Sequence, residues 1–199
     1  CGEFESGHNY FTHRFSTGDK NLEYPISYAP EKRWNLKSDI SDKVLLIHYE
    51  QGFGDTFMYC RFVPMMKNLA KQVIFVVQDS LYDLIKNSKI ISDGVMVVSE
   101  CQSENLEYDF HMALLDTPFV LKISAKNLPL CEKYLEVEDD KVKVYADKYL
   151  NKSNRIKVGI CLHGNKNANY KGRDIELSKM QELFNLRDVE FYLLTEDKE

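Results

Sequence analysis

A glycine-containing turn between an apolar run and a helix-like pattern holds the first residues that could carry out chemistry. The segment 50–55, EQGFGD, follows the apolar run 43–49. In a parallel α/β sheet, ligands bind where strands end, and glycines there let backbone N–H groups approach them. Asp55 puts a carboxylate where a phosphate would otherwise bind, so the turn favours Asp55 as a general base. The alternative is that Asp55 only caps the helix and the glycines only shape a turn.

A second polar loop, from His163 to Arg173, follows the apolar run 157–162. It contains three positive charges, three amides and two glycines in eleven residues. Such a loop can hold a diphosphate through charge-assisted hydrogen bonds, and the alternative is a solvated surface loop. Of the five histidines, His163 is the best functional candidate because it ends a strand beside this loop, whereas His48 and His111 are expected in the core.

The elements that must position the first loop alternate along the chain. Apolar, β-rich runs predict strands at 43–49, 72–78, 95–98 and 108–114. Helix-like patterns lie between them at 56–70, where Pro64 is expected to kink the helix or mark a change of helix, and at 80–85. Alternation of this kind predicts a parallel sheet. We therefore predict an α/β fold in which a Rossmann-like parallel sheet carries helices on both faces.

The same plan restarts in the last quarter of the chain. A buried strand is predicted at 157–162, a helix at 177–186 and a strand at 190–194. One β-α-β unit cannot bury both faces of its sheet, which indicates the incomplete start of a second Rossmann-like domain. The predicted organisation is an extended lead-in over 1–41, a first domain over 42–152 and the start of a second over 153–199.

Composition and charge exclude several classes of function. The chain has 199 residues and a net charge of −5, which argues against binding to nucleic acid or to an anionic membrane. No apolar run approaches the ~20 residues that a transmembrane helix needs. The five cysteines are widely spread, so we expect no disulfide framework or zinc site and a cytoplasmic location; Cys60 and Cys161 are expected in the core.

Four segments together show a resemblance to a known family. They are LLIHYEQGFGDTFMYCRFVPMM, QVIFVVQDSL, YDFHMALLDTPFVL and KVGICLHGNKNANYKGRDIEL. Their combination resembles the glycosyltransferase-like domain that follows tetratricopeptide repeats in many bacterial proteins. That domain is similar to the heptosyltransferase family, which has the two-domain GT-B fold. The resemblance covers about residues 30–195.

The resemblance implies a role for each loop. In such enzymes the first domain binds the sugar acceptor, and the aspartate of a Gly-Asp pair deprotonates the acceptor hydroxyl. Here that pair is Gly54-Asp55, with Gln51 and Gly52 in the same loop. The donor's phosphates would be held by a group of polar residues in the second loop: His163, Asn165, Lys166, Lys171 and Arg173. Either Lys171 or Arg173 would take the family's main phosphate-binding position.

The expected function is therefore transfer of a sugar from a nucleotide-sugar donor to a glycan, lipid-linked or protein acceptor. No metal or other cofactor is expected, because Lys and Arg can stabilise the leaving diphosphate and no D-x-D motif is present. Most donor contacts of the family would lie beyond Glu199, so we expect this chain to be inactive alone. The alternative function is a non-catalytic glycosyltransferase-like module for protein interaction, and the oligomeric state stays open.

Overall fold

The computed structural model describes residues 2–18, 28–129, 133–150, 153–162 and 175–194. The chain divides into two compact units, residues 1–138 and 139–199. This division falls ahead of the boundary predicted after residue 152. Each unit is described by itself below.

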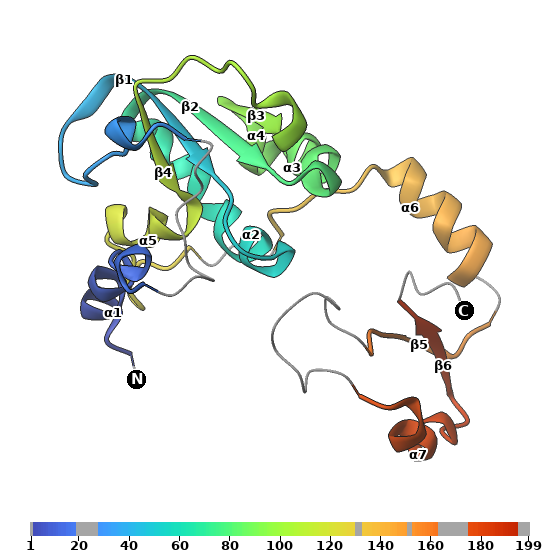
Figure 1. Cartoon of the computed structure of the whole chain (residues 1–199). Coiled ribbons are helices and arrows are strands. Elements are labelled where there is room, and N and C mark those ends of the chain that lie inside the picture. The colour runs from blue at the N-terminus through green and yellow to red at the C-terminus, as the bar shows by residue number, and fades with distance from the viewer. Residues whose placement is uncertain (1, 19–27, 130–132, 151–152, 163–174, 195–199) are drawn as a thin grey trace. The chain divides into compact units, whose positions relative to one another are not determined.

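A four-stranded parallel sheet forms the centre of the first unit (Figure 1). Its strands are β1 (Ile40–His48), β2 (Ala70–Val77), β3 (Val95–Ser99) and β4 (Phe110–Ala113), in the order β3-β2-β1-β4. Leu45 of β1 lies opposite Val73 of β2 on one side and Phe110 of β4 on the other. The predicted parallel α/β sheet is confirmed at this level.

The connection from β1 to β2 contains α2 (Phe53–Tyr59), which continues as a 3-10 segment, Cys60–Asn68. The predicted single helix over 56–70 therefore changes type at Cys60. A proline ring inside a helix clashes with the carbonyl four residues earlier, and Pro64 stands four residues after Cys60. The change of helix expected from Pro64 thus occurs at Cys60, about one helical turn before the proline.

Short helices make up most of the remaining connections. They are a 3-10 turn at Asp79–Leu81, α3 (Tyr82–Asn87), α4 (Lys89–Ser92), 3-10 turns at Glu100–Gln102 and Leu114–Asp116, and α5 (Thr117–Val120). The helix predicted at 80–85 is preceded by this first 3-10 turn, which includes Ser80, and α3 has no side-chain cap.

The lead-in is not extended throughout, which corrects the prediction for residues 1–41. It contains α1 (Phe4–Phe11), a 3-10 turn at Arg14–Ser16 and another at Pro30–Lys32, and β1 already begins at Ile40. Helix α1 packs beside α5 (Figure 1). The turn after α1 carries Arg14, which is buried and bonds to Glu50 and Asp116, far away in the sequence.

The two faces of the sheet are covered differently. On the first face, Leu45, Ile47 and Phe75 pack in one cluster with apolar residues of the helical connections. On the second face, Leu46, Ile74, Val76 and Val98 pack against Tyr28, Val44, Leu106 and Tyr108. Val44 belongs to β1 itself, and Tyr28, Leu106 and Tyr108 lie outside the described helices, so this cluster departs from the prediction of helices on both faces. The chain passes from β3 to β4 through the 3-10 turn at Glu100–Gln102 and an irregular segment that supplies Leu106 and Tyr108 to this face.

The second unit is small. It contains α6 (Asp139–Tyr145) with a π-helical turn at Ala146–Leu150, β5 (Ile156–Ile160), a 3-10 turn at Leu177–Met180, α7 (Gln181–Phe184) and β6 (Val189–Leu193). β5 and β6 form a two-stranded parallel sheet. The strand–helix–strand order matches the prediction, but β5 is largely exposed rather than buried, and Cys161 is exposed too. With β6 as its one strand neighbour among the described residues, β5 has little to bury it.

Candidate functional site

The loop after β1 brings together the residues predicted around Asp55. Gly52 stands at the N-cap of α2, and its backbone N–H donates to Asp55 Oδ2 at 3.1 Å. Asp55 thus lies in the first turn of the helix rather than at the cap itself. Its side chain is half-buried, while Gln51, Gly52 and Gly54 are exposed. Asp55 therefore does help to cap α2, as the alternative interpretation of the sequence proposed, and it does so through Oδ2.

Two details of this loop point beyond a simple turn. Gln51 has φ +60°, a left-handed conformation that costs a non-glycine residue roughly 1 kcal/mol or more. Gly54, in contrast, has no positive φ, and a Cβ added there would meet no atom within 4 Å. The fold therefore does not require glycine at position 54, and the space beside it is open to an approaching molecule.

Gln78 joins this loop to the end of the neighbouring strand. It follows β2 and is 8% exposed, and its Oε1 accepts a hydrogen bond from the buried Thr56 hydroxyl at 2.9 Å. Its Nε2 has no hydrogen-bond partner among the described residues. Because exchanging the amide's N and O atoms would leave the other one unpaired, one polar atom is unsatisfied in either orientation.

A buried ion cluster lies on the other side of the loop. The guanidinium of Arg14 contacts the Glu50 carboxylate through Nη2–Oε1 at 2.7 Å and Nε–Oε2 at 3.2 Å, and donates to Asp116 Oδ1 at 2.5 Å. Arg14, Glu50 and Asp116 are 4%, 7% and 2% exposed. The rings of Phe11 and Phe15 lie 4.4 and 4.2 Å from its guanidinium carbon, so cation–π contacts complete the enclosure.

The place of this cluster in the sheet matters for function. Glu50 follows β1 and Asp116 follows β4, and these strands are parallel neighbours. The chain leaves β1 toward β2 on one side and returns as β4 on the other, so this is the topological switch point where such sheets bind ligands. In this protein, Arg14 from the lead-in occupies the position between the two strand ends.

The cluster contains two carboxylates and one guanidinium. Burial raises the pKa of Glu50 to about 7, because desolvation of the carboxylate outweighs the lowering effect of Arg14. Burial raises the pKa of Asp116 in the same way, again against the effect of Arg14. A single cation shared by two buried acids cannot compensate both, so the cluster retains a proton more readily than separate carboxyl groups in water.

The remaining predicted residues fall into two groups. His48 and His111 are confirmed as core residues; Tyr28 stacks on His48 with ring centroids 4.5 Å apart, and burial lowers the pKa of His48 to about 3. The predicted phosphate-binding residues lie outside the described part of the chain: His163, Asn165, Lys166, Lys171 and Arg173.

Sequence reasoning missed Arg14, Gln78 and Asp116. Asp116 and Gln78 carried a usable signal, since each is a polar residue within three positions of the end of an apolar strand, as Glu50 is. Arg14 carried none, because its partners stand 36 and 102 residues away.

The described residues contain no group of three or more His, Cys, Asp or Glu side chains placed to hold a metal ion. Among the same residues, no helix has the length and apolar character needed to cross a bilayer.

Removing the buried cation should strongly destabilise the first unit. We expect Arg14→Met to lower its free energy of unfolding by about 3–5 kcal/mol at pH 7.5, since two buried carboxylates lose their partner. Urea unfolding followed by the fluorescence of Trp34, the one tryptophan of the chain, measures this. The control is Lys43→Met, which removes an exposed ion pair with Asp42 and should change little. Equal stability of the two variants would contradict the assigned role of Arg14.

The stability of the first unit should also depend on pH through Glu50. Its pKa is about 7 when folded and 4.5 in the reference state, so the folded protein binds more protons between these values. The free energy of unfolding should therefore fall as pH rises from 4.5 through about 7. Glu50→Gln should flatten that slope, and Asp116, shifted in the same direction, should leave a residual slope. Parallel pH curves for the two proteins would refute the shift.

Comparison of this chain with protein-family models, curated proteins and solved structures finds no match in any of the three.

Proposed function

We propose that this chain is part of a glycosyltransferase that moves a sugar from a nucleotide-sugar to an acceptor hydroxyl, with Asp55 as the base. The observation that carries the proposal is the position of Asp55: a half-buried carboxylate at the carboxyl end of a central parallel strand, beside open space at Gly54. The strained backbone at Gln51 and the unsatisfied amide of Gln78 lie at the same edge of the sheet and support it.

The proposed chemistry uses the two oxygens of Asp55 differently. Oδ2 is held by the Gly52 N–H, which orients the carboxylate. Oδ1 takes the proton of the acceptor hydroxyl while the hydroxyl oxygen forms a bond to the anomeric carbon of the donor. The bond from that carbon to the nucleoside diphosphate breaks, and the diphosphate leaves with the electron pair. In the proposal, Lys171 or Arg173 stabilises its negative charge, supported by His163, Asn165 and Lys166.

A non-catalytic binding module is the second candidate, and one observation favours it. The crevice between β1 and β4, where a ligand would bind in such a sheet, is filled by the Arg14 side chain and its two carboxylate partners. A domain whose switch point is closed in this way could keep the fold and have lost the chemistry. Under the glycosyltransferase proposal, by contrast, the acceptor is bound on the loop side, near Gln51 and Gly54.

Two substitutions at one position separate catalysis from capping. Asp55→Asn keeps an oxygen that can accept the Gly52 N–H but removes the base; Asp55→Ala removes both. If Asp55 is the base, transfer should fall at least about 100-fold in both variants, while only Asp55→Ala should lose about 0.5–1 kcal/mol of stability. The measurement is nucleoside diphosphate release and sugar transfer by the protein at its natural length, with a panel of nucleotide-sugars.

The outcomes decide between the two candidates. Transfer that survives in Asp55→Asn and falls only in Asp55→Ala would mean that Asp55 acts as a cap and not as a base. A natural-length protein that transfers sugar from no donor of the panel would favour the binding module.

A further inference from the structure

A tyrosine stands one helical turn after Asp55 on the same helix. Tyr59 is the last residue of α2 and follows Asp55 by four positions, so the two side chains lie on one face of the helix, with Cβ atoms roughly 5–6 Å apart. Side chains on a helix lean toward its N-terminus, which directs the Tyr59 ring toward Asp55. Both residues are half-buried, between the packed side of α2 and its exposed side.

The exposed side of α2 leaves room beside this pair. Gly54 and Met58 also stand four positions apart, and both are exposed. A Cβ added at Gly54 would meet no atom within 4 Å. The helix thus carries a polar pair, Asp55 and Tyr59, next to a pair that combines open space with an apolar side chain. A sugar ring has matching features, since its hydroxyls lie at its edge and its C–H groups on its faces.

The ring of Tyr59 is held by packing, and its hydroxyl is left without a partner. The ring packs against the core cluster of the first face and lies edge-on to Phe62, with centroids 6.0 Å apart. No hydrogen bond joins its hydroxyl to a described residue. The described side-chain atoms that are both unpaired and buried are His8 Nε2 and Gln78 Nε2. The unpaired Tyr59 hydroxyl is therefore accessible to solvent.

The surroundings of Tyr59 keep its hydroxyl protonated. Burial raises the pKa of Tyr59, and the carboxylates of Asp55 and Glu50 raise it further, against the lowering effect of Arg14. At neutral pH the hydroxyl therefore carries a proton that it can donate to an oxygen. Asp55 Oδ1 can only accept a hydrogen bond while the carboxylate is ionised. A donor and an acceptor on one helix face suit two hydroxyls of the same molecule.

We propose that Tyr59 is a second acceptor-binding residue, whose hydroxyl donates a hydrogen bond to the oxygen next to the hydroxyl that Asp55 deprotonates. This inference rests on the proposed function. It narrows the acceptor to a sugar with two neighbouring hydroxyls, rather than a serine or threonine side chain or a simple alcohol. The second contact decides which hydroxyl reaches Asp55, so Tyr59 determines the position on the acceptor at which the new bond forms.

Binding of simple glycosides to this chain tests the proposal without a donor. The probes are the methyl α-pyranosides of glucose, galactose and mannose, followed by NMR through the backbone amide of Gly54. At least one should shift this amide saturably. Tyr59→Phe keeps the ring and removes only the hydroxyl, so it should weaken that binding about 5- to 10-fold. The matched control is Tyr82→Phe, which removes the hydroxyl of another half-buried tyrosine, on α3, and should change nothing.

Removing hydroxyls from the bound glycoside one at a time identifies the contact. One deoxy analogue should bind the wild type as weakly as the parent glycoside binds Tyr59→Phe. The same analogue should lose nothing further in Tyr59→Phe, because the hydrogen bond is already absent. If every analogue loses affinity again in that variant, the Tyr59 hydroxyl contacts none of the sugar hydroxyls.

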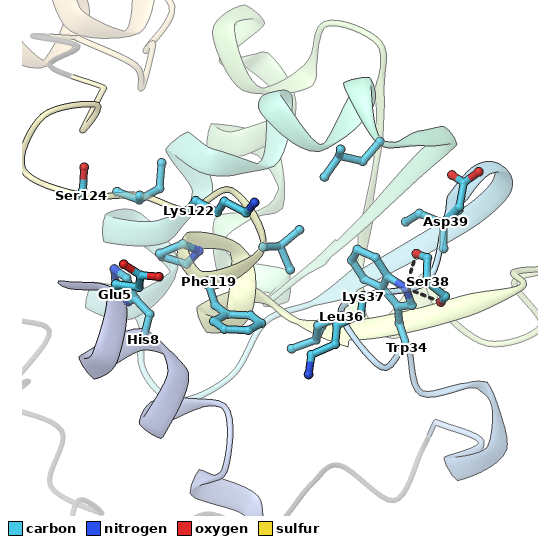
Figure 2. A pocket seen from close by; sticks show the side chains of 15 residues that line it. Glu5, His8, Trp34, Leu36, Lys37, Ser38, Asp39, Phe119, Lys122 and Ser124 are labelled. Atoms are coloured by element: carbon cyan, nitrogen blue, oxygen red, sulfur yellow. Dashed lines mark hydrogen bonds between the residues drawn. The ribbon is translucent and has the colours of Figure 1, made fainter.

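A glycoside bound elsewhere on the first unit would be recognised by a second signal. A cavity of about 750 Å³, lined partly by Trp34, Ile40 and Phe119, lies where β1 begins, at the other end of the strand from the Asp55 loop (Figure 2). The Trp34 indole N–H, bonded to the Ser38 carbonyl at 3.1 Å, gives one NMR signal that reports on this cavity. Saturable shifts of that signal without shifts at Gly54 would contradict the proposal.

The proposal and the function on which it rests fail in different ways. No saturable shift at Gly54 with any of the three glycosides, or equal affinities of wild type and Tyr59→Phe, would overturn the role of Tyr59 whatever the transfer assay shows. Tyr59-dependent binding by a protein that transfers sugar from no donor would instead remove the reaction and keep the binding site. If Tyr59→Phe does not fold, nuclear Overhauser contacts between the Tyr59 ring and the glycoside in the wild type decide the question, and their absence would refute the contact.

Discussion

The first unit depends on the contact of one buried arginine with two carboxylates. Arg14 comes from the lead-in, Glu50 from the end of β1 and Asp116 from the end of β4, so a single guanidinium joins three distant parts of the chain. Burying these charges is costly, and leaving either carboxylate without its partner would cost more. The contact therefore requires the lead-in to be docked whenever the strand ends are in place. It also explains why α1 and the following turn, which bury little else that is polar, belong to the same compact unit as the sheet.

This contact divides the carboxyl edge of the sheet into a closed part and an open part. The crevice between β1 and β4 is closed by Arg14, and the loop from Gln51 to Asp55 remains accessible beside it. Any chemistry at this edge must then take place on the loop side, near Asp55 and the end of β2. The raised pKa of Glu50 has the same origin, because closing the crevice removes two carboxylates from water and supplies one cation. The closed crevice and the raised pKa of Glu50 are thus both consequences of the buried contact of Arg14 with two carboxylates.

Much of the sheet could be predicted from the sequence because apolar runs such as 45–47 and 73–77 are buried on both sides and leave a clear pattern. The loop at Gln51–Asp55 was predictable for a related reason, since glycine and polar residues directly after such a run mark a strand end. The lead-in was not predictable: the helix at Phe4–Phe11 has no buried residue of its own and depends on tertiary contacts. The exposure of β5 was missed because an apolar run looks the same whether or not neighbouring elements cover it.

The central claim is that the Arg14 cluster ties the lead-in to the sheet. Native-state hydrogen exchange tests it most directly. The backbone N–H of Ser16, bonded to the His13 carbonyl at 2.9 Å, reports on the turn that carries Arg14, and the N–H of Trp34, bonded to the His111 carbonyl at 2.9 Å, reports on docking against β4. If the cluster holds the lead-in, both amides should open with a free energy close to that of Ile47 in β1. Free exchange at Ser16 while Ile47 stays protected would show that the lead-in detaches, and that the crevice between β1 and β4 is open.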